Sequence, residues 1–335
     1  MDNSFFVFSE EIENLILHRF HVCSWEFRDS TGLTEFGIEI NQEQVKNRES
    51  LILNLYIPWL DSECIIEDYY TKLMDLQNLK FIFNEIPTGH KVFDEDGGKT
   101  GCVQEFKDCD SLCLFPVTCT ISDKVLKIKL DLKDYKKNRS IAGDSNLYLR
   151  IALSNKNKAS IRLQKAGLNK STIIYDIKIN EKRNLPAIIK VKYPCKISTA
   201  FYFNIVPNNF ELVFYDNKTL QNVRNLEYSG FKKYLNDKRV RENDLVVIKC
   251  KEKGKDSYSF FNYFTNEVIG VGVLAIGFLL ELVCGILLFL PSLENDGIDH
   301  NLWNLPWELY TACSISFLMI VYFFLKKFRP NILPW

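Results

Sequence analysis

Two long apolar runs near the C-terminus constrain this chain more than any other feature. The first, Val268–Leu290, has 23 residues and one charged side chain, Glu281. As a helix it reaches about 34 Å, enough to cross a hydrocarbon core of about 30 Å. The second, Trp307–Leu325, follows a polar connector and has no charge from Leu309 onward. The pair predicts a transmembrane helical hairpin. The alternative is a buried helical pair in a soluble domain, but such helices are rarely apolar all round.

The charges beside the two runs predict how this hairpin is oriented. The connector Pro291–Pro306 has acidic residues and no Lys or Arg. The basic residues lie before the first run and after the second: Lys249, Lys251, Lys253, Lys255, Lys326, Lys327 and Arg329. Basic flanks stay in the cytoplasm, so we expect a multi-pass protein of the inner (cytoplasmic) membrane with both termini inside. Aromatic residues over Tyr258–Phe264 and Trp303–Tyr310 are then expected at headgroup level. Met1–Leu15 has no basic leader, so we expect no secretory signal peptide and a cytosolic N-terminal part.

The charge of the chain is unevenly distributed. The net charge of zero combines −13 through Pro116, +17 over residues 117–255 and −4 over residues 256–335. A basic half beside a membrane suits anionic inner-leaflet lipid or an anionic ligand such as a nucleotide. A third interpretation of this charge distribution is that the acidic and basic parts of the chain attract each other. We expect residues 1–255 to form one β-rich cytosolic domain, with an acidic first half and a basic second half, and residues 256–335 to form the hairpin.

Short runs of alternating hydrophobicity dominate residues 1–255. In Val125–Leu132, Leu126 and Ile128 share one face of a strand and Lys127 and Lys129 the other. The expected strands are His21–Phe27, Leu33–Ile40, Leu51–Ile57, Leu79–Phe83, Leu112–Ile121, Val125–Leu132, Leu147–Leu153, Ser160–Leu163, Thr172–Ile179, Ile188–Tyr193, Ile197–Val206, Phe210–Tyr215 and Leu245–Lys251. The expected helices are Glu10–His18, Ser62–Gln77 and Ser229–Asn236. This pattern predicts a mainly β fold, an antiparallel sandwich or barrel-like domain.

No motif in the sequence indicates catalysis, a cofactor or a metal. The GKT at Gly98–Thr100 lacks the earlier glycine of a phosphate-binding loop, because Phe93 stands at that position. The ten cysteines include a group at Cys102, Cys109, Cys113 and Cys119, whose spacing differs from the close pairs of structural zinc sites. In a cytosolic domain we expect buried free thiols. We therefore expect neither an enzyme nor a cofactor or metal site.

Glu281 is the strongest local signal for function. A carboxylate within a membrane span is costly and faces a helix partner or a water-filled cavity. It shares one helical stripe with Gly277, Cys284 and Gly285. These four residues are the expected pore lining. In the alternative, Glu281 bonds to hydroxyl groups of the second run and holds the hairpin together. Two helices cannot enclose a water path, so a pore demands a homo-oligomer with a ring of carboxylates that favours cations.

The basic half contains a second candidate site. Tyrosines interleave with its cationic residues, and guanidinium groups clamp phosphates while aromatic rings stack on bases. The expected ligand-binding residues are Lys136, Lys137, Arg139, Arg150, Arg162, Lys165 and Arg183. The alternative is a set of solvated strand faces rich in lysine.

A sheet-rich domain with a basic second half, followed by the spans Val268–Leu290 and Trp307–Leu325, resembles the two-span membrane effectors of bacterial antiphage systems. The similar proteins are the Hailong-type channel effector and the two-span β effectors of cyclic-oligonucleotide systems. The resemblance is one of architecture and carries over no residue. It implies antiviral defence by a membrane channel or permeabilising protein, gated by a nucleotide or short oligonucleotide messenger, with a nucleotidyltransferase encoded nearby.

Two hypotheses follow for the function. In the first, the cytosolic domain binds the messenger and shifts an oligomeric hairpin bundle between closed and conducting states. In the second, the hairpin is only an anchor for a protein-binding module or scaffold, without a pore. Both include the lipid bilayer as a partner.

Overall fold

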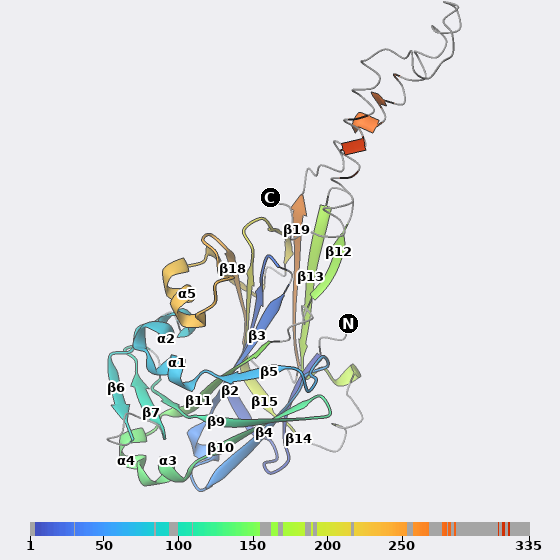
Figure 1. Ribbon diagram of the computed structural model, residues 1–335. Helices are drawn as coiled ribbons and strands as arrows, with labels where there is room; N and C mark the ends of the chain where they lie inside the picture. The colour runs from blue at the N-terminus through green and yellow to red at the C-terminus, as the bar shows by residue number, and fades with distance from the viewer. Residues whose placement is uncertain are drawn as a thin grey trace, which may run out of the picture. The chain divides into compact units, whose positions relative to one another are not determined.

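The chain folds into two mixed β-sheets with short helices along one of them (Figure 1). The computed structural model describes residues 4–29, 31–83, 85–93, 100–108, 110–154, 162–166, 170–184, 189, 193–215, 218–252 and 257–267, and ten residues between 277 and 321. Residue contacts divide the chain into two units, Met1–Leu163 with Ile173–Phe264, and Gln164–Thr172 with Thr265–Trp335. The mainly β prediction is confirmed.

The first sheet has nine strands. In spatial order they are β16 (Glu211–Tyr215), β19 (Tyr258–Glu267), β13 (Lys170–Ile179), β1 (Ser4–Ser9), β4 (Ser50–Tyr56), β10 (Val125–Asp131) and β9 (Val117–Ser122), with β12 (Arg162–Ala166) beside β13 and β14 (Tyr193–Pro194) beside β1.

The second sheet has ten strands. In spatial order they are β17 (Leu220–Asn225), β18 (Leu245–Glu252), β15 (Lys196–Val206), β2 (Ile16–Glu26), β3 (Gly32–Ile40), β11 (Asn146–Ser154), β8 (Leu112–Leu114), β7 (Cys102–Glu105) and β6 (Gly89–Val92), with β5 (Ile65–Asp68) beside β11.

The helices are short. They are α1 (Tyr70–Met74), α2 (Leu76–Phe83), α3 (Lys133–Lys137), α4 (Arg139–Ala142) and α5 (Tyr228–Leu235), with 3₁₀ turns at Gln42–Gln44 and Lys182–Asn184. Asn236, at φ 54°, ends α5, and its backbone N–H donates to the carbonyl of Lys232. Asparagine tolerates this left-handed conformation better than most residues.

The expectation of purely antiparallel sheets is wrong. Parallel pairs are present in both sheets, among them β1 with β13, β2 with β15, and β8 with β11. Parallel neighbours need long crossover connections, and β2 and β15 are indeed far apart in the chain. The acidic and basic halves therefore interleave within both sheets.

The two sheets pack face to face around one apolar core, as in a sandwich. Phe36 of β3, Leu53 of β4 and Ile128 of β10 are fully buried in it. The ring of Phe5 on β1 meets that of Phe36 edge-on at 5.4 Å between centroids, which joins the sheets. In β10, buried Leu126 and Ile128 alternate with exposed lysines, as the sequence predicted.

The ten-stranded sheet buries its other face as well. We call this the outer face, because it is turned away from the nine-stranded sheet. Trp25 of β2 and Tyr148 of β11 belong there to a second apolar cluster with Leu73 of α1, Ile82 of α2 and Phe231 of α5. Figure 1 shows α1, α2 and α5 stacked along one side of this sheet. Because both faces are covered, the central strands carry buried residues at nearly every position.

Two of the three expected helices differ from prediction. Ile16–His18 extends β2, and Asn14, at φ 58°, precedes it in a turn, so a helix at Glu10–His18 is wrong. The Ser62–Gln77 segment holds β5, α1 and only the start of α2. Its first part is a strand because Ile65 and Ile66 pair with β11. The third, Ser229–Asn236, corresponds to α5.

Two expected strands also differ. Leu79–Phe83 is helical and forms the end of α2. Leu112–Ile121 is divided into β8 and β9, which belong to different sheets. Pro116 lies between them, and proline supplies no N–H donor to continue a ladder. Expected strands Ser160–Leu163 and Ile188–Tyr193 fall mostly outside the described residues.

The sheet continues beyond residue 255. Tyr258, Phe260 and Phe264 of β19 are 4%, 1% and 0% exposed. Placing them at the membrane headgroups is therefore wrong, because their rings fill the sheet core.

The described residues of both C-terminal apolar runs are helical: 277–279, 281, 282, 285, 314, 317, 318 and 321. Within the described part of the chain, no helix is both long and apolar enough to cross a membrane.

Candidate functional site

A buried polar cluster lies on the outer face of the ten-stranded sheet, beneath the helices. Its centre is Glu35 of β3, which is 0% exposed, and Arg150 of β11, which is 4% exposed. Arg150 Nε and Nη2 lie 2.7 and 2.6 Å from Glu35 Oε2. Both side chains point to this face because strand residues alternate. A buried charge must be paired and hydrogen-bonded to be tolerated, and here each charge neutralises the other.

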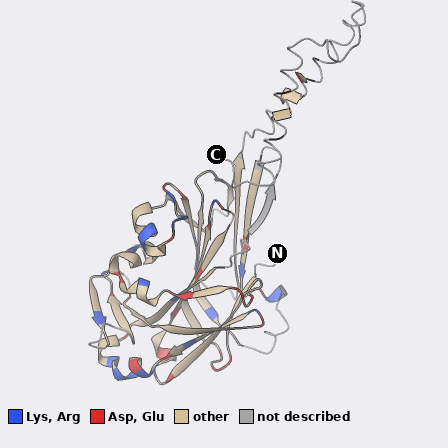
Figure 2. Ribbon diagram, in the orientation of Figure 1, with Lys and Arg blue, Asp and Glu red and all other residues tan. Residues whose placement is uncertain are grey.

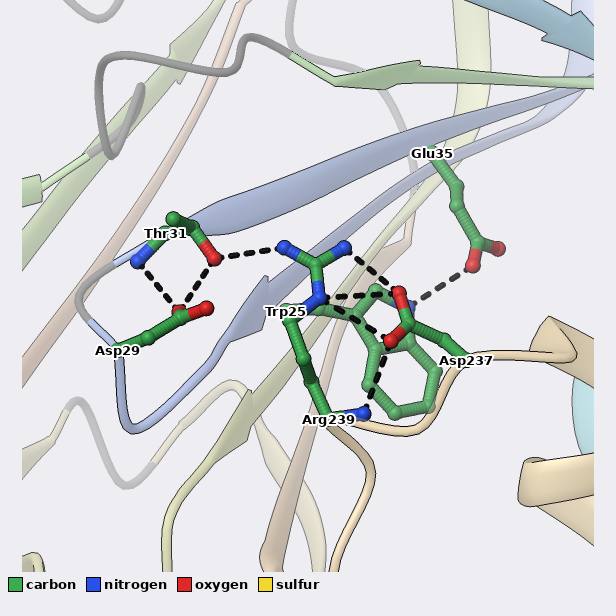
Figure 3. A network of polar contacts seen from close by, with 6 residues as sticks. All are labelled: Trp25, Asp29, Thr31, Glu35, Asp237 and Arg239. Carbon is green, nitrogen blue, oxygen red and sulfur yellow. Dashed lines mark hydrogen bonds and ion pairs between the residues drawn. The ribbon is translucent and has the colours of Figure 1, made fainter.

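The helix α5 and strand β2 complete the coordination of Glu35. Tyr234 of α5 donates its hydroxyl to Glu35 Oε2 at 3.0 Å. Trp25 of β2 donates its indole N–H to Glu35 Oε1 at 2.8 Å, which Figure 3 shows. Both carboxylate oxygens thus have partners, and one bond ties the helix to the sheet.

The cluster extends through Tyr148 to His21. The Tyr148 hydroxyl lies 3.2 Å from Arg150 Nη1 and 3.2 Å from His21 Nδ1. Gly37 makes room for this contact, since a Cβ there would lie 2.4 Å from the hydroxyl. Burial, then the positive charges of Arg150 and Arg19, hold the pKa of His21 well below 6.5. The imidazole is therefore neutral at pH 7.

A pocket opens beside this cluster, between α5 and the sheet. Its cavity volume is about 20 Å³, room for about one water molecule. Its walls are mainly apolar and aromatic, and they include the charged residues Glu35, Arg150 and Arg224. The lining residues are Cys23, Trp25, Glu35, Ile82, Arg150, Phe203, Ile205, Arg224, Phe231, Tyr234, Val246 and Ile248.

The pocket thiol is not an activated nucleophile. Burial, then the nearby Glu35 carboxylate, raises the pKa of Cys23 well above its usual range. A reactive cysteine needs the opposite shift, toward the thiolate. Cys23 is therefore a buried, protonated thiol at neutral pH.

A second polar network lies at the turn between β2 and β3 of the ten-stranded sheet. Arg239 Nη2 lies 2.6 Å from Asp237 Oδ2, and its Nη1 donates to Thr31 Oγ1 at 2.6 Å. The backbone N–H of Thr31 donates to Asp29 Oδ1 at 3.0 Å (Figure 3). Arg239 also lies over the ring of Phe27, 4.1 Å from its centroid. Burial would raise the pKa of Asp237, but hydrogen bonds from Arg239 lower it. This network fastens the β2–β3 turn to the segment after α5.

A third network lies in the core between the sheets. Asn262 of β19 donates to Asn204, Asn204 donates to Ser24, and the Ser24 hydroxyl lies 2.8 Å from that of Tyr202. All four residues are almost fully buried. These bonds link β19, the strand before the first apolar run, to the opposite sheet.

The structure separates the residues expected to bind ligand. Lys136 and Lys137 are exposed on α3, within 3.9 Å of Glu49 and 3.6 Å of Asp134 respectively. Figure 2 shows acidic and basic residues intermingled along this helix. Arg139 begins α4 nearby and donates to the Lys46 carbonyl at 3.3 Å.

The remaining expected residues lie elsewhere. Arg150 is in the buried cluster, with Glu35 as its counter-ion. Arg183, 85% exposed, pairs with Glu181 beside a 3₁₀ turn. Arg162 and Lys165 are in β12, whose side chains lie outside the described residues. The pocket residues Trp25, Glu35 and Tyr234 were missed, although a charge inside the apolar strand pattern of Gly32–Ile40 was a signal for them.

The expected pore residues lie in the second unit. Gly277, Glu281 and Gly285 are helical and exposed in the single chain, and a Cβ added at either glycine would meet no described atom within 4 Å beyond its own helix. Cys284 is outside the described residues. In the first unit, none of the described cysteines is in a disulfide, and all but Cys119 are buried. Among the described residues, no group of three His, Cys, Asp or Glu side chains could hold a metal ion.

No protein-family model matches the chain, and no curated protein matches it in sequence.

Proposed function

We propose that the chain is a ligand-controlled membrane effector of bacterial antiviral defence. A cytosolic mainly β domain binds a nucleotide-type messenger, and the hairpin of Val268–Leu290 and Trp307–Leu325 permeabilises the membrane as an oligomer. The main support for this proposal is that the described residues of both runs are helical and that some of their apolar side chains are exposed. Phe317 and Leu318 are 66% and 64% exposed. Such side chains need a bilayer or neighbouring helices to cover them.

Glu281 supports an oligomer with a water path. Its side chain is exposed in the single chain. Gly277 and Gly285, one turn before it and one turn after, leave open space where another helix can approach closely. Several copies arranged around the first run would bring these carboxylates together as a ring that attracts cations.

The membrane potential of bacterial cells expressing the chain tests this function. The wild type should depolarise the membrane under phage challenge, and Glu281→Gln, at matched protein levels, should reduce the depolarisation at least tenfold. Glu242→Gln, an exposed carboxylate in the first unit, is the matched control and should behave as the wild type. A wild type that never depolarises the membrane, or a purified chain that stays monomeric in bilayers, would contradict the proposal.

The second candidate function, a membrane-anchored protein-binding module, is favoured by one observation. Val213 and Phe214 of edge strand β16 are 54% and 58% exposed, and Phe214 meets the ring of Phe261 on β19. Exposed apolar side chains on an edge strand suit strand addition by a partner. This function predicts that unrelated spans can replace both apolar runs without loss of activity, whereas the channel function predicts complete loss.

A further inference from the structure

Edge strand β16 exposes apolar side chains on both of its faces. Val213 and Phe214 are consecutive, so they point to opposite faces of the nine-stranded sheet, and they are 54% and 58% exposed. Phe214 meets the ring of Phe261 on β19 at 5.8 Å between centroids, and Phe261 is itself 36% exposed. In the described part of the chain, β16 has a neighbouring strand on one side only. Its other side therefore presents a row of backbone N–H and C=O groups to a further strand.

The other three terminal strands of the two sheets have features that disfavour pairing with another chain. In β9, the Val117 N–H already donates to Asp68 Oδ2 at 2.9 Å, and the exposed side chains are those of threonine and serine. β17 has a bulge between Leu220 and Asn222. β6 presents Lys91, whose side chain is 55% exposed. Lysine, polar side chains and bulges are common protection for sheet edges, whereas β16 contains no Lys, Arg or Pro.

The sequence of β16 is complementary to itself. When two copies pair antiparallel about Val213, each Val213 lies opposite its counterpart. Leu212 then lies opposite Phe214, and Glu211 lies opposite Tyr215. Directly opposite residues share one face of a sheet, so apolar side chains meet on both faces of the pair. Like charges do not meet, because Glu211 is the one charged residue of the strand and it faces a tyrosine.

The contact area of such a pair is small. Stable interfaces bury about 1,200–2,000 Å² in total, and two strands of five residues supply only a fraction of this. Pairing is therefore weak between chains in dilute solution. It is favoured where the chains are confined together, because confinement raises their effective concentration. The hairpin of the proposed effector would confine the chains to one membrane.

We infer that β16 is an interaction surface for a second copy of this chain. Two copies pair antiparallel through Glu211–Tyr215 and join their nine-stranded sheets into one. This interface lies in the first unit and is additional to any contact between the apolar runs. The inference rests on the proposed function only for the membrane that brings the copies together, and the pairing has a readout of its own.

Cysteine variants of the full-length chain and a short bismaleimide test the pairing. The crosslinking is done in permeabilised bacterial cells and on the purified chain over a range of concentrations, so it does not require a membrane. Val213→Cys lies at the twofold axis and should give a dimer on a denaturing gel. Glu211→Cys is the matched control on the same strand, because its counterparts lie four residues apart along the strands, about 14 Å. Thr120→Cys is an exposed control on β9.

The dimer yield of Val213→Cys should be at least tenfold higher than that of Glu211→Cys, Thr120→Cys or the wild type. The wild type reports crosslinking through the native cysteines. Equal yields for Val213→Cys and Glu211→Cys would overturn the inference, because random collision would explain both. Absence of a Val213→Cys dimer in cells and at every concentration of the purified chain would overturn it too.

A charge at the twofold axis should break the pairing. Val213→Lys keeps an exposed side chain but places two lysines opposite each other. In a chain that carries Phe214→Cys, it should lower dimer crosslinking at least tenfold, at an unchanged Tm. Thr120→Lys adds the same charge on β9 and should leave the crosslinking unchanged. Equal dimer yields with and without Val213→Lys would contradict pairing through β16.

Other occupants of β16 give different products. A crosslink between Val213→Cys of one chain and Thr120→Cys of another, in excess of the Val213→Cys dimer, would overturn the inference in favour of β16 pairing with β9. A crosslink from Val213→Cys to a different protein, in place of the dimer, would overturn it in favour of a foreign partner.

The pairing and the channel fail in different ways. Glu281→Gln should leave the Val213→Cys dimer unchanged. A Val213→Cys dimer of a chain that never depolarises membranes would retain the pairing and remove the channel. Glu281-dependent depolarisation by a chain that gives no Val213→Cys dimer would do the reverse.

Discussion

Gly37 is the residue on which the geometry of the buried cluster depends most directly. Gly37→Ala places a Cβ 2.4 Å from the Tyr148 hydroxyl and 3.1 Å from His21 Nδ1. The Tyr148–His21 contact must then break or the central strands must separate. We expect a loss of stability of about 1–3 kcal/mol, seen as a lower Tm of the full-length chain. Thr118→Ala, on the exposed side of β9, is the control and should change stability by less than about 0.5 kcal/mol. Equal Tm values for the two variants would contradict the tight contact.

The depressed pKa of His21 makes stability depend on pH. In the unfolded chain the imidazole takes up a proton as the pH falls below its ordinary pKa of 6.5, whereas the buried imidazole stays neutral. The unfolded state then binds more protons, so stability falls as the pH decreases from about 6.5 to 5. The slope attributable to one histidine is at most about 1.4 kcal/mol per pH unit. His21→Gln should lose less stability than the wild type between pH 7 and pH 5.5. An equal loss would show that His21 does not set this slope.

Arg150 shows the limit of residue-level prediction. Arg150 is a cationic residue between apolar ones. This sequence pattern occurs both in a strand that has one face in solvent and in a central strand that is covered on both faces. Only the position of β11 in the sheet, beneath the helices, makes it a buried ion partner rather than a surface ligand. The sequence could not supply that position, because it depends on pairings with β3, β5 and β8.

At the scale of elements, polar contacts join α5 both to the sheet and to the junction between α1 and α2. Tyr234 bonds to Glu35, and Lys233 lies 2.7 Å from Asp75. Tyr234→Phe keeps the ring but removes the hydroxyl. Glu35 Oε2 then loses one donor in a buried site, at a cost of about 1–3 kcal/mol.

Hydrogen exchange measures the loss of the Tyr234–Glu35 bond directly at helix α5. Amide exchange in α5 should be faster in Tyr234→Phe than in the wild type, while exchange in β10, on the other sheet, should keep its rate. Lys232→Ala, on the exposed side of the same helix, is the control. Unchanged exchange in α5 would mean that apolar packing alone holds the helix.

The elements predicted best were strands with one buried apolar face and one exposed polar face. β10 was correct because its buried leucines alternate with exposed lysines, and a two-residue turn with positive φ at Asp123 and Lys124 closes its hairpin with β9. β19 was missed because its aromatic residues stand beside an apolar run and match a membrane interface equally well. α2 was mistaken for a strand because a short apolar segment has no distinct period.

At the scale of the whole molecule, ion pairs join the acidic and basic halves of the first unit. Arg150–Glu35, Lys233–Asp75 and Lys136–Glu49 each join a cation of residues 117–255 to a carboxylate of residues 1–116. These pairs are compatible with mutual attraction of the two halves, which stays one of the three interpretations of the charge distribution. The pairing of β2 with β15 and of β3 with β11 agrees with one continuous β-rich unit rather than two domains.

The central claim is that the two apolar runs form a hairpin with both ends in the cytosol. Reporter fusions in bacterial cells test it most directly. Alkaline phosphatase, active only outside the cytoplasm, is fused after Asn295 in the connector or after Trp335, and green fluorescent protein, which is fluorescent only inside, is fused at the same places. The account predicts an active phosphatase only after Asn295 and fluorescence only after Trp335. Fluorescence at both places, with the chain released from membranes by alkaline carbonate, would contradict it.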